Sequence, residues 1–212
     1  MKRKLAGLYA ITPDEPDTGV LVGKIGQALS GGASVVQYRN KTAAPGLRRE
    51  QARALAALCR AAGALFIVND DLALALALDA DGVHLGADDG ALAEARARLP
   101  QGKLLGASCY DRIELAQAAL RAGADYLAFG SVFSSDTKPR APRAPLAIFA
   151  EARRSIGLPL VAIGGITLEN ASQAFTAGAD AVAVIRALFD AADVAECAAG
   201  FTRLHQRQRM QL

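Results

Sequence analysis

Two short apolar runs, Leu65–Val68 and Gly82–Leu85, each lead into a group of acidic residues. Both runs are bounded by turn residues and predict buried strands, and the Leu/Ala-rich segment Leu72–Leu78 between them predicts a short helix. A strand–helix–strand unit is right-handed with parallel strands, so the carboxyl ends of the two strands lie side by side. Carboxylates that follow the two strands are therefore predicted to face a common space, where a cation would relieve their repulsion.

The individual aspartates in these two groups have different predicted roles. Asp is a favoured N-cap residue of helices, and we assign this structural role to Asp71 and Asp88. We assign a metal-binding role to Asp70 after the first strand and Asp89 after the second, because other polar strand ends, described below, support a ligand site.

The length of 212 residues suits one large domain or two small ones, and because no linker is evident we expect a single domain that spans residues 1–212. Of these residues 52% are hydrophobic, which is sufficient for a large core. The net charge of +3 and the absence of a basic run with interleaved aromatic residues argue against nucleic acid as a partner. No stretch approaches the roughly eighteen apolar residues of a membrane helix. The three widely spaced cysteines, Cys59, Cys109 and Cys197, fit neither a metal site nor a disulfide framework and indicate a reducing cytoplasm.

Strand and helix patterns alternate along the whole chain. The predicted strands are Gly7–Thr12, Ser34–Arg39, Leu65–Val68, Gly82–Leu85, Leu104–Ser108, Tyr126–Val132, Leu160–Ile163 and Ala181–Ile185. The predicted helices are Leu21–Leu29, Gly46–Ala62, Leu72–Leu78, Ala91–Arg98, Ile113–Ala122, Leu146–Ile156, Asn170–Ala177 and Ala191–Arg207. About eight such units, several of them separated by a Gly-Ala-Asp repeat, predict an α/β fold, a single (β/α)₈ TIM barrel. The alternative is a doubly wound open sheet, but no Gly-x-Gly-x-x-Gly follows the first strand.

Polar side chains gather at the carboxyl ends of the predicted strands, where a barrel of this kind carries its chemistry. Gln37, Arg39 and Lys41 alternate along one strand, so their side chains share one face, and buried cations of this kind usually meet an anion. Gly164-Gly165 and the turn Ile185-Arg186 can present backbone N–H groups to a phosphate. Since Mg²⁺ binds one or two carboxylates together with substrate phosphate oxygens, the pattern predicts two phosphorylated substrates, one of them a Mg²⁺-bound diphosphate.

These residues resemble the thiamin phosphate synthase family over nearly the whole chain. The segments that carry the resemblance are Gly7–Pro13, Gln37–Lys41, Val68–Asp71, Gly82–Gly86, Gly106–Ser108, Gly130–Phe133 with Thr137–Pro139, and Ala162–Ile166. The resemblance implies a TIM barrel that joins hydroxymethylpyrimidine diphosphate to a thiazole phosphate and releases pyrophosphate. In the family mechanism pyrophosphate leaves first, and the thiazole nitrogen captures the pyrimidine cation.

The resemblance also implies the roles of individual residues. The pyrimidine diphosphate would contact Gln37, Arg39, Lys41, Asn69, Ser108 and Lys138; Mg²⁺ would bind Asp70 and Asp89; the thiazole phosphate would contact Ser135, Thr137, Gly165, Ile185 and Arg186. Among these we expect Lys138, Ser108 and Arg39 to be catalytic. The expected partners are these small molecules, and a homo-oligomer is left open.

Three positions depart from the family pattern. Ser135 stands in place of the usual Thr and keeps the hydroxyl, Ala87 replaces a common Gln, and Arg186 replaces a small Ser, where it would either strengthen phosphate binding or block the pocket. We expect His84 to be a packed or hydrogen-bonded structural residue, and His205 to face solvent.

Three rival functions follow from the same pattern. A thiazole tautomerase of the same fold would have little use for the carboxylate pair and the cations. A silent phosphate-binding barrel would need only the glycine turns, and a phosphosugar isomerase would need an acid/base pair that the sequence does not provide.

Overall fold

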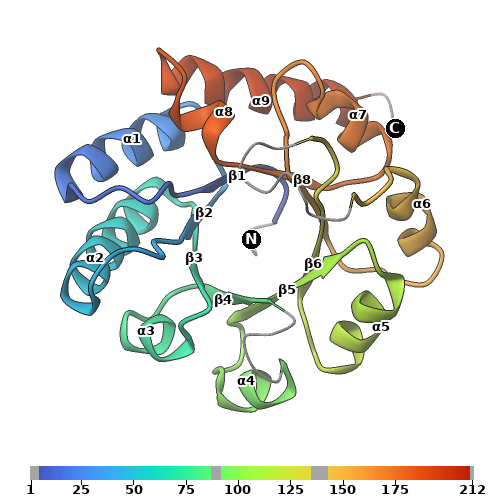
Figure 1. The fold of residues 1–212 in the computed structure, drawn as a ribbon, viewed down its shortest axis with the longest axis horizontal. Coiled ribbons are helices and arrows are strands. Elements are labelled where there is room, and N and C mark those ends of the chain that lie inside the picture. Colours follow the sequence, from blue (N-terminus) through green and yellow to red (C-terminus); the bar gives the residue numbers. More distant parts are fainter. Residues whose placement is uncertain (1–4, 87–91, 135–142, 211–212) are drawn as a thin grey trace.

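Eight strands form a closed barrel in the part of the chain that the computed structural model describes, residues 5–86, 92–134 and 143–210 (Figure 1). The strands are β1 (Gly7–Ile11), β2 (Val35–Tyr38), β3 (Leu65–Asn69), β4 (Gly82–Leu85), β5 (Leu104–Tyr110), β6 (Tyr126–Phe129), β7 (Leu160–Ile163) and β8 (Ala181–Val184). The helices are α1 (Thr18–Ser30), α2 (Pro45–Ala62), α3 (Leu72–Ala77), α4 (Leu92–Arg98), α5 (Ile113–Arg121), α6 (Ala147–Arg153), α7 (Ala171–Thr176), α8 (Arg186–Phe189) and α9 (Val194–Arg209).

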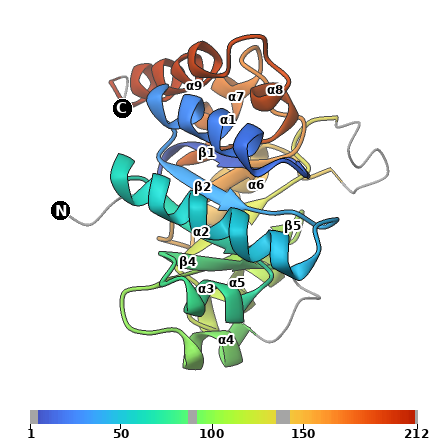
Figure 2. The same cartoon turned by 90° about the vertical axis from the view of Figure 1, so that its left-hand side faces the viewer.

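Every strand is parallel to both neighbours, and the barrel closes where β1 pairs with β8. In this last pair Gly7 lies opposite Ala181 and Ala10 opposite Val184. The helices surround the ring of strands, and Figure 2 shows α1, α2 and α3 along one side of it. The predicted (β/α)₈ TIM barrel is therefore confirmed, and the doubly wound open sheet is excluded.

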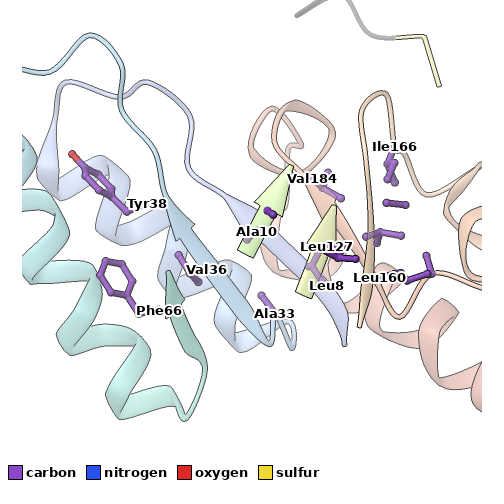
Figure 3. Close-up of a cluster of buried hydrophobic side chains, with 14 of the residues drawn as sticks. Leu8, Ala10, Ala33, Val36, Tyr38, Phe66, Leu127, Leu160, Ile166 and Val184 are labelled. Carbon is purple, nitrogen blue, oxygen red and sulfur yellow. The ribbon is translucent and has the colours of Figure 1, made fainter. Parts of the chain in front are cut away.

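Apolar side chains alternate between the two faces of each strand and form two separate clusters. Leu8 and Val36 point outward and pack beneath the helices, in the cluster shown in Figure 3. Tyr9 and Ile67, from alternate positions, point inward and belong to the cluster inside the barrel. Strands that are buried on both faces read as continuous apolar runs, which is why the strands were evident in the sequence.

The Gly-Ala-Asp repeat has a structural explanation at the amino-terminal ends of the strands. Asp125, just before β6, accepts a hydrogen bond from the backbone N–H of Leu105 in β5 at 2.7 Å. Asp180, just before β8, accepts one from Leu160 in β7, also at 2.7 Å. Each aspartate thus joins its own strand to the preceding one.

The structure differs from the predictions in several places, among them three elements and His205. Helix α8 was not expected, because four residues are too few to show helical periodicity. The last helix is α9, shifted to Val194–Arg209, and β6 ends at Phe129 instead of Val132. His205 does not face solvent freely: it is half-buried on α9 with its ring 5.2 Å from that of Phe175, so the prediction of a solvent-facing histidine is wrong. Among the described residues, no helix is long and apolar enough to span a membrane.

Candidate active site

A cavity of about 490 Å³ opens at the carboxyl ends of β2 and β3. Four of the predicted site residues line it, namely Arg39, Lys41, Asn69 and Asp70. The first two extend from the end of β2, and the other two from the end of β3, so the parallel pairing of these strands brings both groups together. Of the predicted site residues, two cations and a carboxylate therefore line one pocket.

The backbone that carries the two cations is fixed by β1 and the loop after it. The Thr12 hydroxyl donates to the Arg39 carbonyl at 2.7 Å and accepts from the Arg39 backbone N–H at 2.8 Å. Asp14 pairs with the Arg39 guanidinium at 3.5 Å and accepts from the backbone N–H of Lys41 at 2.9 Å. Asp14 and Thr12 thus position both residues, and neither was assigned this role from the sequence.

Asp70 has a backbone conformation that is unusual for its residue type. Its φ of 63° lies in the left-handed region, where residues other than glycine are uncommon and cluster at functional sites. The Asn69 side-chain amide donates to the Asp70 carboxylate at 2.6 Å, and the Asp70 N–H donates to the His84 carbonyl at 2.9 Å. The next residue, Asp71, accepts from the Leu74 N–H at 2.8 Å and caps α3, as predicted.

Arg48 on α2 also lines the cavity, although it was not predicted as a site residue. Its Nε is buried and has no hydrogen-bond partner among the described residues. Burial raises the pKa of the neighbouring Tyr38 hydroxyl to about 12, and the positive charge of Arg48 opposes this increase. In the sequence, Arg48 is one of several arginines on an amphipathic helix and carries no signal that separates it from a surface residue.

Two further predicted residues, Gln37 and Ser108, belong to one hydrogen-bonded group inside the barrel and do not line the cavity. Gln37 Nε2 donates to the Tyr9 hydroxyl at 2.7 Å, and Ser108 Oγ lies 2.9 Å from His84 Nε2. Tyr126 joins these two hydrogen-bonded pairs, because its hydroxyl lies 2.9 Å from that of Tyr9 and 3.1 Å from His84 Nδ1. The prediction of a hydrogen-bonded structural histidine at position 84 is confirmed.

The predicted phosphate turns lie at the ends of β7 and β8. Gly165 has a φ of 64°, and a Cβ atom on it would lie 2.1 Å from the Ser134 carbonyl oxygen, so the close approach of that backbone is sufficient to require glycine here. Ile185 precedes α8, and Arg186 is its first residue. The Arg186 side chain is exposed and its Nε lies 3.4 Å from Asp190 Oδ2, so it pairs along the helix.

Four predicted site residues, Asp89, Ser135, Thr137 and Lys138, lie outside the described residues, as does Ala87. Within residues 5–86, 92–134 and 143–210, no group of three or more His, Cys, Asp or Glu side chains is arranged to hold a metal ion. Asp70 is thus the described half of the predicted metal pair.

Cys109, next to Ser108 on β5, is fully buried, and burial raises the pKa of its thiol to about 12. Because the thiolate is the reactive form, this cysteine is a packing residue, as predicted.

Comparison with known proteins shows the family. A family model described as thiamine monophosphate synthase matches residues 8–188. The thiamine-phosphate synthase of Chromobacterium violaceum is 57% identical over 198 residues, which cover 93% of this chain and 95% of the relative. That of Aromatoleum aromaticum is 54% identical over 201 residues, 95% and 97% of the two chains.

A solved structure agrees with these relatives in both fold and sequence. The thiamine phosphate pyrophosphorylase from Pyrococcus furiosus superimposes with a TM-score of 0.86 at 36% identity, and the match covers 97% of this chain and 98% of that one. A 3-hexulose-6-phosphate synthase from Salmonella typhimurium, with a TM-score of 0.74 but 18% identity, shares the fold alone. The chain belongs to the thiamine monophosphate synthase family.

Proposed function

We propose that this protein is a thiamine phosphate synthase that transfers the pyrimidine group of 4-amino-2-methyl-5-hydroxymethylpyrimidine diphosphate to 4-methyl-5-(2-hydroxyethyl)thiazole phosphate. The products are thiamine phosphate and pyrophosphate. The observation that carries this proposal is the cavity at the ends of β2 and β3, in which cations from one strand face an amide and a carboxylate from the other. Family membership supports the same reaction.

The cations of the cavity would bind the diphosphate. Arg39 is held by Thr12 and Asp14, so its guanidinium is oriented before substrate arrives. Lys41 is exposed at the mouth, and Arg48 lies on the α2 side. Charge-assisted hydrogen bonds from such groups to phosphate oxygens are stronger than neutral ones. Asn69 and, from the barrel interior, Gln37 and Ser108 would complete the contacts with this substrate.

We further propose that Asp70 and Asp89 hold Mg²⁺ together with the diphosphate. The Asp70 carboxylate borders the cavity next to the cations, and a carboxylate oxygen is a ligand that Mg²⁺ prefers. Mg²⁺ commonly takes only one or two protein carboxylates when substrate phosphates supply other ligands, so the donor set fits. When bound, the ion would withdraw negative charge from the diphosphate.

The reaction requires stabilisation of a leaving group rather than a nucleophilic side chain. Negative charge grows on the pyrophosphate as the C–O bond breaks, and preorganised donors at this position lower the barrier. We assign this role to Arg39 and Lys138, with Ser108 as a further catalytic contact. The nitrogen of the thiazole is the nucleophile, so a reactive thiol or serine is not needed, in agreement with the high pKa of Cys109.

The thiazole phosphate would bind at another part of the rim, at the ends of β7 and β8. Gly165, at the end of β7, and Ile185 and Arg186, at the start of α8, lie where barrels commonly place a phosphate, at the loops after strands seven and eight and a short extra helix. The backbone N–H groups of this turn would contact the phosphate, while the Arg186 side chain is directed along α8. Ser135 and Thr137 are assigned to the same substrate.

We also propose that the chain works as a single domain in the cytoplasm, since its three cysteines are widely spaced and odd in number. Its partners would be the two small-molecule substrates, with a homo-oligomer open.

The test is incubation of the purified protein with both phosphorylated substrates and Mg²⁺, with thiamine phosphate and pyrophosphate measured as products. We expect equimolar formation of the two. A tautomerase would rearrange a thiazole phosphate without the pyrimidine substrate, and a silent binding barrel would form neither product, so either outcome would overturn the proposal. A Lys138→Ala variant should lower kcat by about 10²–10³, while an unchanged kcat would remove Lys138 from the catalytic residues.

A further inference from the structure

A continuous chain of hydrogen bonds crosses the interior of the barrel from β2 to β5. It runs from Gln37 through Tyr9, Tyr126 and His84 to Ser108, with successive distances of 2.7, 2.9, 3.1 and 2.9 Å. The first four of these residues are buried, and Ser108, at the top, is partly exposed. Five strands contribute one residue each, so the chain depends on the closed barrel.

The position of the Tyr126 ring is tightly constrained. A Cβ atom on Gly106 would lie 2.1 Å from Tyr126 Cζ and 2.3 Å from its hydroxyl oxygen, so only glycine leaves room for this ring. The ring also lies 5.5 Å from the His84 ring, measured between centroids. The Tyr126 hydroxyl is thus held between Tyr9 and His84.

The chemistry of each group gives the chain a direction. The Gln37 amide nitrogen can only donate, so the Tyr9 oxygen accepts there, and in a chain with one hydrogen per contact the Tyr9 hydrogen would go to Tyr126. Burial raises the pKa of both phenols, so each keeps the hydrogen that it donates. In that order Tyr126 would donate to His84 Nδ1, the imidazole hydrogen would lie on Nε2, and His84 would donate it to Ser108.

We propose that this chain orients the Ser108 hydroxyl as a hydrogen-bond donor to an acceptor atom of the pyrimidine diphosphate, with Tyr126 and His84 as positioning residues. The inference rests on the proposed function for the identity of the substrate. Ser108 Oγ already accepts from His84, so its own hydrogen is directed onward, away from the barrel interior. A β-bulge between Ser108 and Tyr110 shifts the register of β5 at this point, and bulges commonly re-aim a side chain next to an active site.

The tautomer of His84 tests the direction of the chain without any substrate. The opposite orientation of the Gln37 amide would reverse every bond and place the hydrogen on Nδ1. The chain has only two histidines, so ¹⁵N-labelled histidine gives a simple NMR spectrum, and a His205→Gln variant assigns it. We expect hydrogen on His84 Nε2 and an unprotonated Nδ1. Hydrogen on Nδ1 would overturn the proposal.

A matched pair of tyrosine variants tests whether Tyr126 holds this tautomer. Tyr126→Phe removes the donor to Nδ1, and we expect His84 to populate both tautomers. Tyr38→Phe removes another buried hydroxyl, which donates to Gln51 outside the chain, and should leave the His84 signals unchanged. An unaltered His84 spectrum in Tyr126→Phe would show that Tyr126 does not set the tautomer.

A double-mutant cycle tests whether Tyr126 acts through Ser108. Loss of one well-formed hydrogen bond should reduce kcat/KM for the pyrimidine diphosphate about tenfold in Tyr126→Phe. In a Ser108→Ala background the same change should cost less than about twofold, because coupled residues are not additive. Fully additive effects would overturn the positioning role. If the protein formed no thiamine phosphate at all, the proposed function would fall, but the tautomer measurement would still stand.

Discussion

Aspartates occupy both ends of the barrel, but their surroundings differ. At the amino-terminal ends of the strands, Asp125 and Asp180 each accept a hydrogen bond from a backbone N–H of the preceding strand. Each also pairs with an arginine of the helix that leads into that preceding strand, on α4 for Asp125 and on α6 for Asp180. At the carboxyl-terminal ends, Asp70 lies in the left-handed region, accepts from the Asn69 amide and borders a cavity lined by cations. The same residue type therefore joins strands at one end and faces a ligand space at the other.

This difference agrees with a general division in TIM barrels, in which one end carries stability and the other carries chemistry. The hydrogen bonds of Asp125 and Asp180 are made entirely within the fold. The strained backbone at Asp70 is a cost that the surrounding structure must offset, and such a cost is expected where a side chain has to be aimed. Substitutions at the two ends should consequently affect different measurements.

The largest expected effect is on catalysis, from Asp70→Asn. Asparagine tolerates the left-handed conformation, so the free energy of unfolding should change by less than about 0.5 kcal/mol. Loss of the carboxylate should remove a Mg²⁺ ligand and lower kcat by about 10²–10³. Steady-state kinetics and thermal unfolding of the same sample would separate the two effects. EDTA should abolish turnover of the unaltered protein, and full activity in either experiment would contradict the metal role.

At the amino-terminal ends of the strands, the corresponding substitution is Asp180→Ala, which should affect stability instead of catalysis. It leaves the Leu160 N–H and the Arg153 guanidinium without their carboxylate partner, and we expect the free energy of unfolding to fall by about 2 kcal/mol. The kcat should be unchanged. Glu94→Ala is the control, because the pair of Glu94 with Arg98 is exposed and its loss should cost less than about 0.5 kcal/mol. A large loss of kcat in Asp180→Ala without loss of stability would break the distinction between the two ends.

A smaller effect is expected from Arg48→Ala, which removes a cation from the cavity. The KM for the pyrimidine diphosphate should rise about tenfold, and the increase should shrink at high salt because charge interactions are screened. The neighbouring Arg49 is exposed and does not line the cavity, so Arg49→Ala should leave the KM near its original value. Equal effects of the two variants would point to general surface charge rather than a binding contact.

The smallest effect is a pH dependence of stability from His205, near the amino-terminal end of β1. Burial lowers the pKa of His205 below its ordinary value of 6.5, and Arg209 adds to the shift. The unfolded chain therefore binds a proton first as the pH falls, so stability should decrease below about pH 6.5. We expect a contribution of less than about 1 kcal/mol, measured as the difference between wild type and His205→Gln in urea unfolding at pH 7 and pH 5. An identical pH dependence of both proteins would exclude this contribution.

Most of the fold could be predicted from the sequence because its signals are local. Each strand is a short apolar run, and a glycine follows several of the helices, as Gly31 follows α1 and Gly63 follows α2. Helix α8 was missed because four residues contain barely one turn, and the burial of His205 depends on how α9 packs against Gly7 and Phe175. Such packing is a property of the assembled barrel and leaves no trace in the spacing of nearby residues.

The candidate site, like the fold, could be predicted from the sequence only in part. The alternation of Gln37, Arg39 and Lys41 predicted one shared strand face, and this holds only in part: β2 ends at Tyr38, so Arg39 and Lys41 line the cavity from beyond the strand, while Gln37 is buried in the barrel. The contact between Tyr9 and Tyr126 joins residues 117 positions apart and depends on the stagger of strands across the barrel. The spacing of neighbouring residues says nothing about that stagger, so the interior hydrogen-bond chain could not be predicted.

The closure of the barrel by β1 and β8 has a consequence for synthesis of the chain. The unpaired edge of β1 cannot find its partner until residues 181–184 have left the ribosome. At typical elongation rates of about 5–20 residues per second, that takes roughly 10–35 s after β1 emerges. During this time one strand edge with an apolar sequence is exposed, a state prone to pairing with other chains. Nascent chains of this protein should therefore depend on chaperones more than their modest size suggests.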